Sequence, residues 1–285
     1  MYESGVTRIG RAEFVWGKRT YIMGIINMSP ESFSGDGIST VEVAIKQALR
    51  FADEGADILD IGGGSTRPGL ASISDDEEIK RVIPVIERLL KEVEIPISVD
   101  TSKLEVADLA LNAGAAMLND QWGLKEGKKL AELAATNKVP ILLMSNQRDK
   151  GAYDTATGRD TASYEDVMVE VISTLKKSIA SALEAGVPAK NIIVDPGIGF
   201  GKTWRQDLEI LRRLKEIKAL GYPLLIGTSR KSLIKMVLKT PAADRVEGTA
   251  ATVAIGIANG ADIVRVHDVK QMVRVCRMAD AIVRI

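Results

Sequence analysis

Polar side chains that could do chemistry recur at one kind of position in this chain, directly after short apolar runs. In the stretch IIVDPGIGFGKT, three β-branched residues at 192–194 end in Asp195, and a glycine-rich segment follows. A short apolar run bounded by turn residues predicts a buried parallel strand, with the carboxylate at its C-terminal tip. Asp195 alone fits the cap of the next helix equally well. Other apolar runs end in the same way, and their polar residues are Asn27, Thr66, Arg67, Asp100, Asn119, Lys231, Arg265 and His267.

Three of these residues are rich in hydrogen-bond acceptors. Asp100 and Asp195 carry carboxylates, which accept two parallel N–H bonds, and the amide of Asn119 both donates and accepts. Such a set suits the donor–acceptor edge of a flat heterocycle such as a pterin or a guanine. Met144 and Phe200 also follow predicted strands, and they fit either the core or a wall against a flat ring.

A second group is rich in donors. Lys231 lies in GTSRKS, Arg67 lies in STRPG, and Arg265 and His267 lie in VRVHD. Alternation along a strand puts Arg265 and His267 on the same side. With the glycine-rich backbone around Gly227, these groups predict a site for a phosphate-type anion.

Asn27 offers an amide oxygen to a hard cation. Mg²⁺ prefers oxygen ligands and binds largely through waters and substrate phosphates, so it is the cofactor we expect. The chain has one cysteine and one histidine, and it therefore has no Cys/His cluster that suggests zinc.

The elements that position these residues alternate along the whole chain. A segment at 8–16 predicts a small hairpin or a plug. Predicted strands then cover 21–26, 58–61, 97–99, 117–118, 140–143, 192–194, 224–226 and 263–266. Predicted helices cover 40–54, 75–93, 103–112, 128–136, 164–185, 207–220, 232–239, 248–259 and 268–285, and a long polar loop covers 145–161.

Eight β–α units without a break predict an α/β fold of the closed (β/α)₈, or TIM-barrel, type. We expect one domain over 1–285, with residues 1–20 as an N-terminal extension or plug. The C-terminal ends of all barrel strands meet at one face, which would bring the polar residues together. An open doubly wound sheet is the alternative. It is disfavoured because no GxGxxG motif follows the first strand.

Charge and hydropathy exclude several classes of partner. The 285 residues carry 38 basic and 38 acidic side chains, so nothing favours nucleic acid or an anionic membrane. No apolar run reaches the roughly 18 residues of a membrane span, and the first residues lack the apolar core of a signal peptide. The single cysteine, Cys276, lies on an apolar helical face and cannot form an internal disulfide, which suits a reducing cytoplasm.

Taken together, the motifs resemble those of the dihydropteroate synthases of the folate pathway. The matching stretches are GIINMSPESFSGDG (24–37), GADILDIGGGSTRPG (55–69), ISVDTSKLEVADLALNAGAAMLND (97–120), IIVDPGIGFGKT (192–203), IGTSRKSLI (226–234) and EGTAATVAIGIANGADIVRVHDV (247–269). They span nearly the whole chain in the expected order. STRPG, DPGIGFGK, TSRKS and RVHDV are specific in combination, although each alone is weak.

The resemblance implies a (β/α)₈ barrel, usually dimeric, that binds small-molecule substrates and uses Mg²⁺. Such an enzyme transfers the pterin-methyl group of 6-hydroxymethyl-7,8-dihydropterin diphosphate to 4-aminobenzoate, releasing pyrophosphate and 7,8-dihydropteroate. By motif position the expected catalytic residues are Asp100, Lys231, Arg265 and His267, and the expected metal ligand is Asn27. The expected pterin and diphosphate ligands are Thr66, Arg67, Asp100, Asn119, Met144, Asp195, Phe200, Gly227, Lys231, Arg265, Val266 and His267. The expected aminobenzoate site comprises Phe33, Thr66, Pro68 and Ser232.

Some positions depart from the family pattern. Gly64 stands where the family usually has Glu, Ser145 stands where it usually has His, and Trp122 belongs to an atypical stretch, QWGL. A non-catalytic pterin-binding homologue therefore stays open as an alternative. A pterin-dependent methyltransferase is a further alternative, although it would not need the TSRKS and RVHDV motifs. A phosphosugar isomerase or aldolase barrel would leave the acceptor-rich residues without a role.

Overall fold

The computed structural model describes residues 5–29, 38, 40–64, 73–148, 153–154, 159–160 and 164–284. Its centre is an eight-stranded parallel sheet of β3 (Tyr21–Asn27), β4 (Ile58–Gly62), β5 (Ile97–Asp100), β6 (Met117–Asp120), β7 (Ile141–Met144), β10 (Ile192–Asp195), β11 (Leu225–Ile226) and β12 (Ile263–Val266). The strand order is β10-β7-β6-β5-β4-β3-β12-β11. A parallel bridge between Val194 and Leu224 joins the two outer strands and closes the barrel. The barrel prediction is confirmed, and the alternative of an open sheet is wrong.

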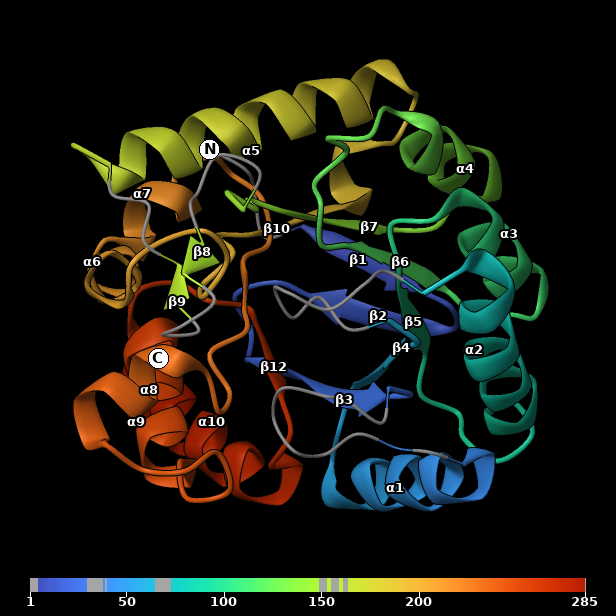
Figure 1. The fold of residues 1–285 in the computed structure, drawn as a ribbon, viewed down its shortest axis with the longest axis horizontal. Helices are drawn as coiled ribbons and strands as arrows, with labels where there is room; N and C mark the ends of the chain where they lie inside the picture. The colour runs from blue at the N-terminus through green and yellow to red at the C-terminus, as the bar shows by residue number, and fades with distance from the viewer. Residues whose placement is uncertain are drawn as a thin grey trace.

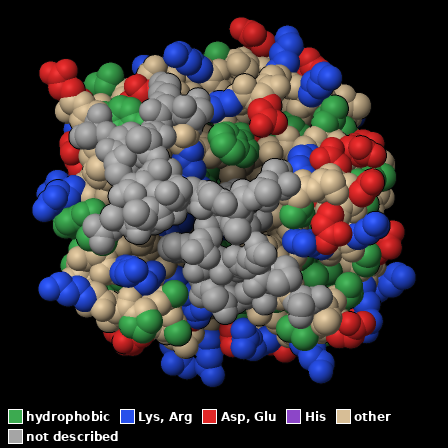
Figure 2. All heavy atoms as spheres, viewed as in Figure 1, with side chains coloured by type: hydrophobic (Ala, Val, Ile, Leu, Met, Phe, Trp, Pro, Cys, Tyr) green, Lys and Arg blue, Asp and Glu red, His purple; other side chains and the backbone are tan. Residues whose placement is uncertain are grey.

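Helices surround the barrel (Figure 1). They are α1 (Val41–Glu54), α2 (Asp75–Leu89), α3 (Leu104–Asn112), α4 (Lys129–Asn137), α5 (Val167–Glu184), α6 (Trp204–Arg212), α7 (Leu214–Lys218), α8 (Ser232–Leu238), α9 (Val246–Ala258) and α10 (Val269–Val283). Among the helices in the described ranges, none combines the length and apolar character needed to cross a bilayer. Basic and acidic side chains are interspersed around the described part of the face in Figure 2.

The predicted single helix at 207–220 is wrong. The helical region begins earlier, at Trp204, because Thr203 and Gln206 form a capping box. It is interrupted at Arg213, whose φ of −105° lies outside the helical range and separates α6 from α7. The predicted loop at 145–161 also contains a small antiparallel pair, β8 (Tyr153–Asp154) and β9 (Arg159–Asp160).

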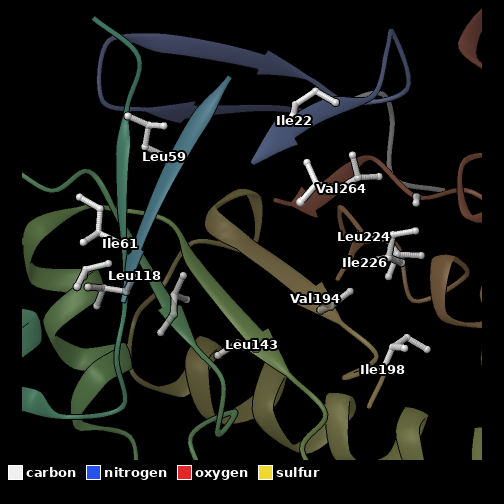
Figure 3. Packing of buried hydrophobic residues seen from close by; sticks show 14 of the residues in the cluster. Ile22, Leu59, Ile61, Leu118, Leu143, Val194, Ile198, Leu224, Ile226 and Val264 are labelled. Atoms are coloured by element: carbon white, nitrogen blue, oxygen red, sulfur yellow. The ribbon is translucent and has the colours of Figure 1, made fainter. Parts of the chain in front are cut away.

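Side chains alternate along each barrel strand between two environments. Those that point outward pack against the helices in one large apolar cluster, which includes Leu59, Leu118 and Val194 (Figure 3). Near the starts of the strands, the side chains that point inward form a separate apolar layer. Its members from the barrel are Tyr21, Met23, Ile58, Met117, Leu142, Ile193, Leu225 and Ile263. The predicted strand positions are therefore buried on both faces, as expected for a parallel barrel.

The hairpin expected at 8–16 is present and covers this inner apolar layer. Its strands are β1 (Val6–Ile9) and β2 (Ala12–Val15), paired antiparallel. Ile9, Phe14 and Trp16 are buried in the same cluster as the inward residues of the barrel. The Nε1 of Trp16 donates to the hydroxyl of Thr7 at 2.8 Å, so the ring is buried without leaving its N–H unpaired. The hairpin thus closes the end of the barrel at which the strands begin.

Candidate active site

A polar layer lies directly above the apolar layer inside the barrel. Asp60, Asn119, Asp195 and Arg265 each follow a member of the apolar layer by two residues, which are Ile58, Met117, Ile193 and Ile263 respectively. Since strand side chains alternate with a period of two, these four polar groups point into the barrel. The structure therefore brings together three of the predicted strand-end residues, Asn119, Asp195 and Arg265, and adds Asp60 to them.

Arg265 is the centre of a buried ionic network in this layer. Its Nε donates to Oδ2 of Asp60 at 2.6 Å, and its Nη2 donates to Oδ2 of Asp100 at 2.8 Å. The Nδ2 of Asn119 also donates to Asp60 Oδ2, at 2.9 Å. No described residue accepts a hydrogen bond from the third nitrogen, Nη1 of Arg265. Arg265 is predicted from the sequence to bind an anion, but two of its nitrogens donate to carboxylates of the site instead.

Asp60 was missed by the sequence analysis although its side chain is fully buried. It lies within the apolar run of β4, and a charge in such a run signals an inward polar position.

Asp100 shares Arg265 with Asp60, and its side chain is likewise largely removed from water. Burial raises the pKa of Asp100 to about 7, although the charge of Arg265 opposes the shift.

Asp195 and Lys231 form a second part of the site. Oδ1 of Asp195 accepts from the backbone N–H of Gly197 at 2.7 Å, so the carboxylate binds its own glycine-rich loop rather than capping the next helix. Nζ of Lys231 donates to the carbonyl of Ile198 and lies 4.3 Å from the centre of the Phe200 ring. Burial lowers the pKa of Lys231 to about 7 and raises the pKa of Asp195.

The glycine-rich loop packs closely on the segment after β7. Gly197 has a φ of +68°, and a Cβ there would lie 2.1 Å from the carbonyl oxygen of Ser145. Only glycine fits this approach. Arg148, which the sequence analysis did not select, donates from Nη2 to the carbonyl of Gly199 at 3.0 Å and stacks 4.3 Å from the Phe200 ring centre. The ring that was expected to wall the site is thus held by two cations.

The loops of Lys231 and His267 are joined to each other. Nδ1 of His267 lies 2.9 Å from the hydroxyl of Ser229. Arg230 binds Asp268 through two nitrogens, at 2.6 and 3.0 Å. Ser229, Arg230 and Asp268 were not predicted as site residues, although all three belong to the TSRKS and RVHDV motifs.

The other predicted residues occupy several positions. Met144 is buried at the end of β7, Phe200 is buried in the glycine-rich loop after β10, and Gly227 follows β11 beside Lys231 and Arg265. Ser232 is the first residue of α8. The side chain of Val266 packs in the outer apolar cluster. Four predicted residues lie outside the described residues: Phe33, Thr66, Arg67 and Pro68.

The predicted metal ligand, Asn27, is the last residue of β3, at the same face of the barrel. Within the described ranges, no group of three His, Cys, Asp or Glu side chains could hold a metal by itself. An amide oxygen without a carboxylate cage fits Mg²⁺ that is bound mainly through substrate phosphates and waters.

Two of the departures from the family pattern lie at the rim of this polar layer. A Cβ on Gly64 would lie 3.6 Å from Oε2 of Glu78. Glu78 is itself buried and paired with Lys103 at 3.1 Å, so a carboxylate already occupies the space beside Gly64. Ser145 is fully buried, and its hydroxyl accepts from Nε2 of Gln147 at 3.1 Å.

Comparison with known proteins identifies the family. The family model of pterin-binding enzymes matches residues 23–267. A dihydropteroate synthase of Clostridium beijerinckii is 48% identical over 279 residues, which is 97% of this chain and 99% of that protein. The chain belongs to the dihydropteroate synthase family. It is therefore an enzyme, and a transferase.

Solved structures of the family have the same fold. A dihydropteroate synthase from Clostridium difficile, crystallised in the presence of pteroic acid, has a TM-score of 0.87 and 47% identity, and the match covers 95% of this chain and 100% of that one. One from Xanthomonas albilineans with 4-aminobenzoic acid has a TM-score of 0.88 and 36% identity, with 98% of each chain covered. These relatives favour a synthase over a pterin-dependent methyltransferase.

Proposed function

We propose that this protein condenses 6-hydroxymethyl-7,8-dihydropterin diphosphate with 4-aminobenzoate to give 7,8-dihydropteroate and pyrophosphate. The observation that carries the proposal is the buried polar layer of Asp60, Asn119, Asp195 and Arg265, with Asp100 bound to Arg265, above a sealed apolar layer. A simple phosphate-binding barrel does not need this set of acceptors deep inside it.

The polar layer suits the edges of a pterin. Asp195 can accept the paired N3–H and 2-amino donors of the ring, because a carboxylate accepts two parallel bonds. Lys231 in its charged form donates to a ring acceptor such as the carbonyl oxygen. Phe200, stacked by Lys231 and Arg148, provides a flat wall at the opening.

The diphosphate would lie where the loops after β11 and β12 meet. His267, positioned by Ser229, donates there, and Nη1 of Arg265 is directed away from its two carboxylate partners. Mg²⁺ held in part by Asn27 would neutralise charge on the leaving pyrophosphate. Donors that are fixed before the reaction stabilise the charge as it develops, without reorganisation.

No protein nucleophile is required by this chemistry. When the bond from the exocyclic methylene to the diphosphate breaks, positive charge is left on the pterin and its methylene carbon. The carboxylate of Asp100, held by Arg265, can stabilise that charge in a buried, weakly screened environment. The nitrogen of 4-aminobenzoate then forms the new bond to the methylene carbon, and the proton that the nitrogen loses passes to solvent or pyrophosphate.

The proposal includes a homodimer. Large apolar side chains are exposed on three neighbouring helices, α8, α9 and α10, and they are Val237, Leu238, Ile255, Met278 and Ile282. Exposed apolar groups on adjacent elements favour a protein partner. We expect a dimer in analytical ultracentrifugation and a monomer when Met278 and Ile282 are both replaced by glutamate. A cytoplasmic location stays a prediction.

The deciding experiment is to mix the purified protein with the pterin diphosphate, Mg²⁺ and 4-aminobenzoate and to measure pyrophosphate. Release that requires 4-aminobenzoate supports the proposal. Release without 4-aminobenzoate would indicate a hydrolase, and binding of the pterin diphosphate without release would indicate a non-catalytic homologue. Arg213→Gln, which changes a surface ion network on α6 and α7, is a control expected to keep full activity.

A further inference from the structure

Gln121 is a buried amide inside the site, next to the carboxylate of Asp100. It follows β6 directly, and its residue is only 8% exposed. Its Nε2 donates to Oδ2 of Asp100, the same oxygen that accepts from Arg265. The backbone carbonyl of Gln121 accepts from Nδ2 of Asn146 at 2.9 Å. The residue is therefore fixed at its backbone and at one end of its side chain.

The turn after Gln121 is also fixed. The carboxylate of Asp120 accepts the backbone N–H groups of Trp122 and Leu124, at 2.9 and 2.6 Å. Backbone N–H groups of the turn in the QWGL stretch are thus paired with a side chain of the same segment. These bonds show that the atypical stretch holds Gln121 in place rather than leaving it to vary in position.

The other end of the Gln121 amide has no partner among the described residues. Its Oε1 is buried and accepts no hydrogen bond, and Oδ1 of Asn119 and Oδ1 of Asp60 are in the same condition. A buried acceptor without a partner is unfavourable, because it has lost its hydrogen bonds to water and gained none in return. Three such acceptors around one arginine indicate that a bound molecule supplies N–H donors at this place.

The orientation of the Gln121 amide is set by chemistry. Ionised Asp100 can only accept, so the NH₂ group of Gln121 must face it and Oε1 must face elsewhere. Arg265 reinforces this arrangement by holding the same carboxylate. Gln121 therefore presents an acceptor, and not a donor, to the ligand.

A 7,8-dihydropterin has three sets of N–H donors: the 2-amino group, N3–H and N8–H. Asp195 fits the adjacent 2-amino and N3–H donors. N8–H lies on the other edge of the ring and is absent from the fully oxidised pterin. We infer that Gln121 is a ligand of the substrate ring, whose Oε1 accepts N8–H and so selects the reduced pterin over the oxidised one. This inference rests on the proposed function, because the dihydropterin is its ligand.

Calorimetry with 6-hydroxymethyl-7,8-dihydropterin and with 6-hydroxymethylpterin tests the inference. We expect the unaltered protein to bind the reduced ring more tightly. In Gln121→Met, which keeps the length of the side chain without its amide, the reduced ring should bind about tenfold more weakly, as expected for one hydrogen bond worth about 1.4 kcal/mol. The oxidised ring should bind with an affinity within about twofold of the original, since no N8–H bond is lost.

Gln206→Met is a matched control. Gln206 is also 8% exposed, but its amide is engaged in the cap of α6 and with the carbonyl of Tyr164. Its loss should lower stability without changing the ratio of the two affinities. If Gln121→Met does not fold, Gln121→Leu replaces it.

The outcomes separate the two proposals. Equal weakening of both rings in Gln121→Met would mean that Gln121 acts only by positioning Asp100, and unchanged affinities would mean that it has no role; either result overturns the inference alone. An unaltered protein that binds neither ring overturns the proposed function as well.

Discussion

Arg230 and Asp268 form a two-point ion pair that joins the loop of Lys231 to the loop of His267. Its bonds are 2.6 and 3.0 Å long, and both side chains are largely buried. Arg230 itself adopts a φ of +57°, which is unusual for a residue other than glycine. Its carbonyl accepts from Nη1 of Arg245 at 2.6 Å, so the strained turn is supported from two sides.

We expect Asp268→Asn to loosen this connection. A lost charge-assisted bond with a partly buried partner should lower the free energy of unfolding by about 2 kcal/mol. Because Lys231 and His267 lose their relative position, kcat/KM should fall about tenfold or more, with most of the loss in KM for the pterin diphosphate. Urea unfolding and steady-state kinetics measure the two effects. Asp166→Asn, at an exposed ion pair with Arg213, is the control, and an equal kinetic loss in that variant would refute the positioning role.

The affinity of the pterin should depend on pH through Lys231 and Asp100. Burial lowers the pKa of Lys231 to about 7, so its charged, donating form is lost as the pH rises above 7. Burial raises the pKa of Asp100 to about 7, so its carboxylate is lost as the pH falls below 7. Binding of 6-hydroxymethyl-7,8-dihydropterin should therefore be strongest near pH 7 and weaken on both sides.

Using the pterin without its diphosphate keeps phosphate titration out of this measurement. In Lys231→Arg the side chain remains charged over the whole pH range. The pterin affinity that this variant retains should therefore no longer decline above pH 7. A flat profile from pH 6 to 9 in the unaltered protein would show that neither group controls binding.

Asp195→Ala should remove most of the pterin affinity. The ring would leave two adjacent N–H donors facing a buried space without an acceptor, at a cost of about 1–3 kcal/mol or more. Calorimetry should show at least a tenfold loss. Asp195→Asn keeps the size of the side chain and one acceptor, so its pterin affinity should lie between those of the unaltered protein and Asp195→Ala. Unchanged affinity in the alanine variant would remove Asp195 from the pterin site.

His267→Ala should affect the diphosphate and not the ring. We expect weaker binding of 6-hydroxymethyl-7,8-dihydropterin diphosphate by about tenfold, from the loss of one charge-assisted bond, and little change for the form without diphosphate. Ser229→Ala, which removes the hydroxyl 2.9 Å from Nδ1, should give a smaller effect in the same direction. Similar losses for both ligands would place His267 near the ring instead.

Much of this architecture was predictable from short apolar runs and the residues that end them. Asn119, Asp195 and Arg265 were found because strand alternation and a common barrel face are enough to bring them together. The break at Arg213 was not predicted, because the amphipathic pattern continues through it and only the backbone angle reveals it.

The partners within the site were harder to predict. Asp60 was overlooked because it lies inside an apolar run rather than after one, and Gln121 because its importance depends on a contact with Asp100. The pairing of Arg265 with two carboxylates depends on distances across the barrel between β12, β4 and β5, which no local sequence pattern encodes. Asp60 nevertheless follows Ile58 by two residues, and this spacing on a strand predicts that both side chains point to the same side.

The hairpin that closes the barrel has a consequence for how the chain folds. Its residues are synthesised before the barrel strands, and the inward side chains that bury them come from strands spread along the chain as far as Ile263. The aromatic side chains of Phe14 and Trp16 therefore have no complete place to pack until β12 has been synthesised. Contacts of such long sequence separation form slowly and leave apolar surface exposed in the meantime. We therefore expect the hairpin to reach its final packing only after β12 has joined the barrel.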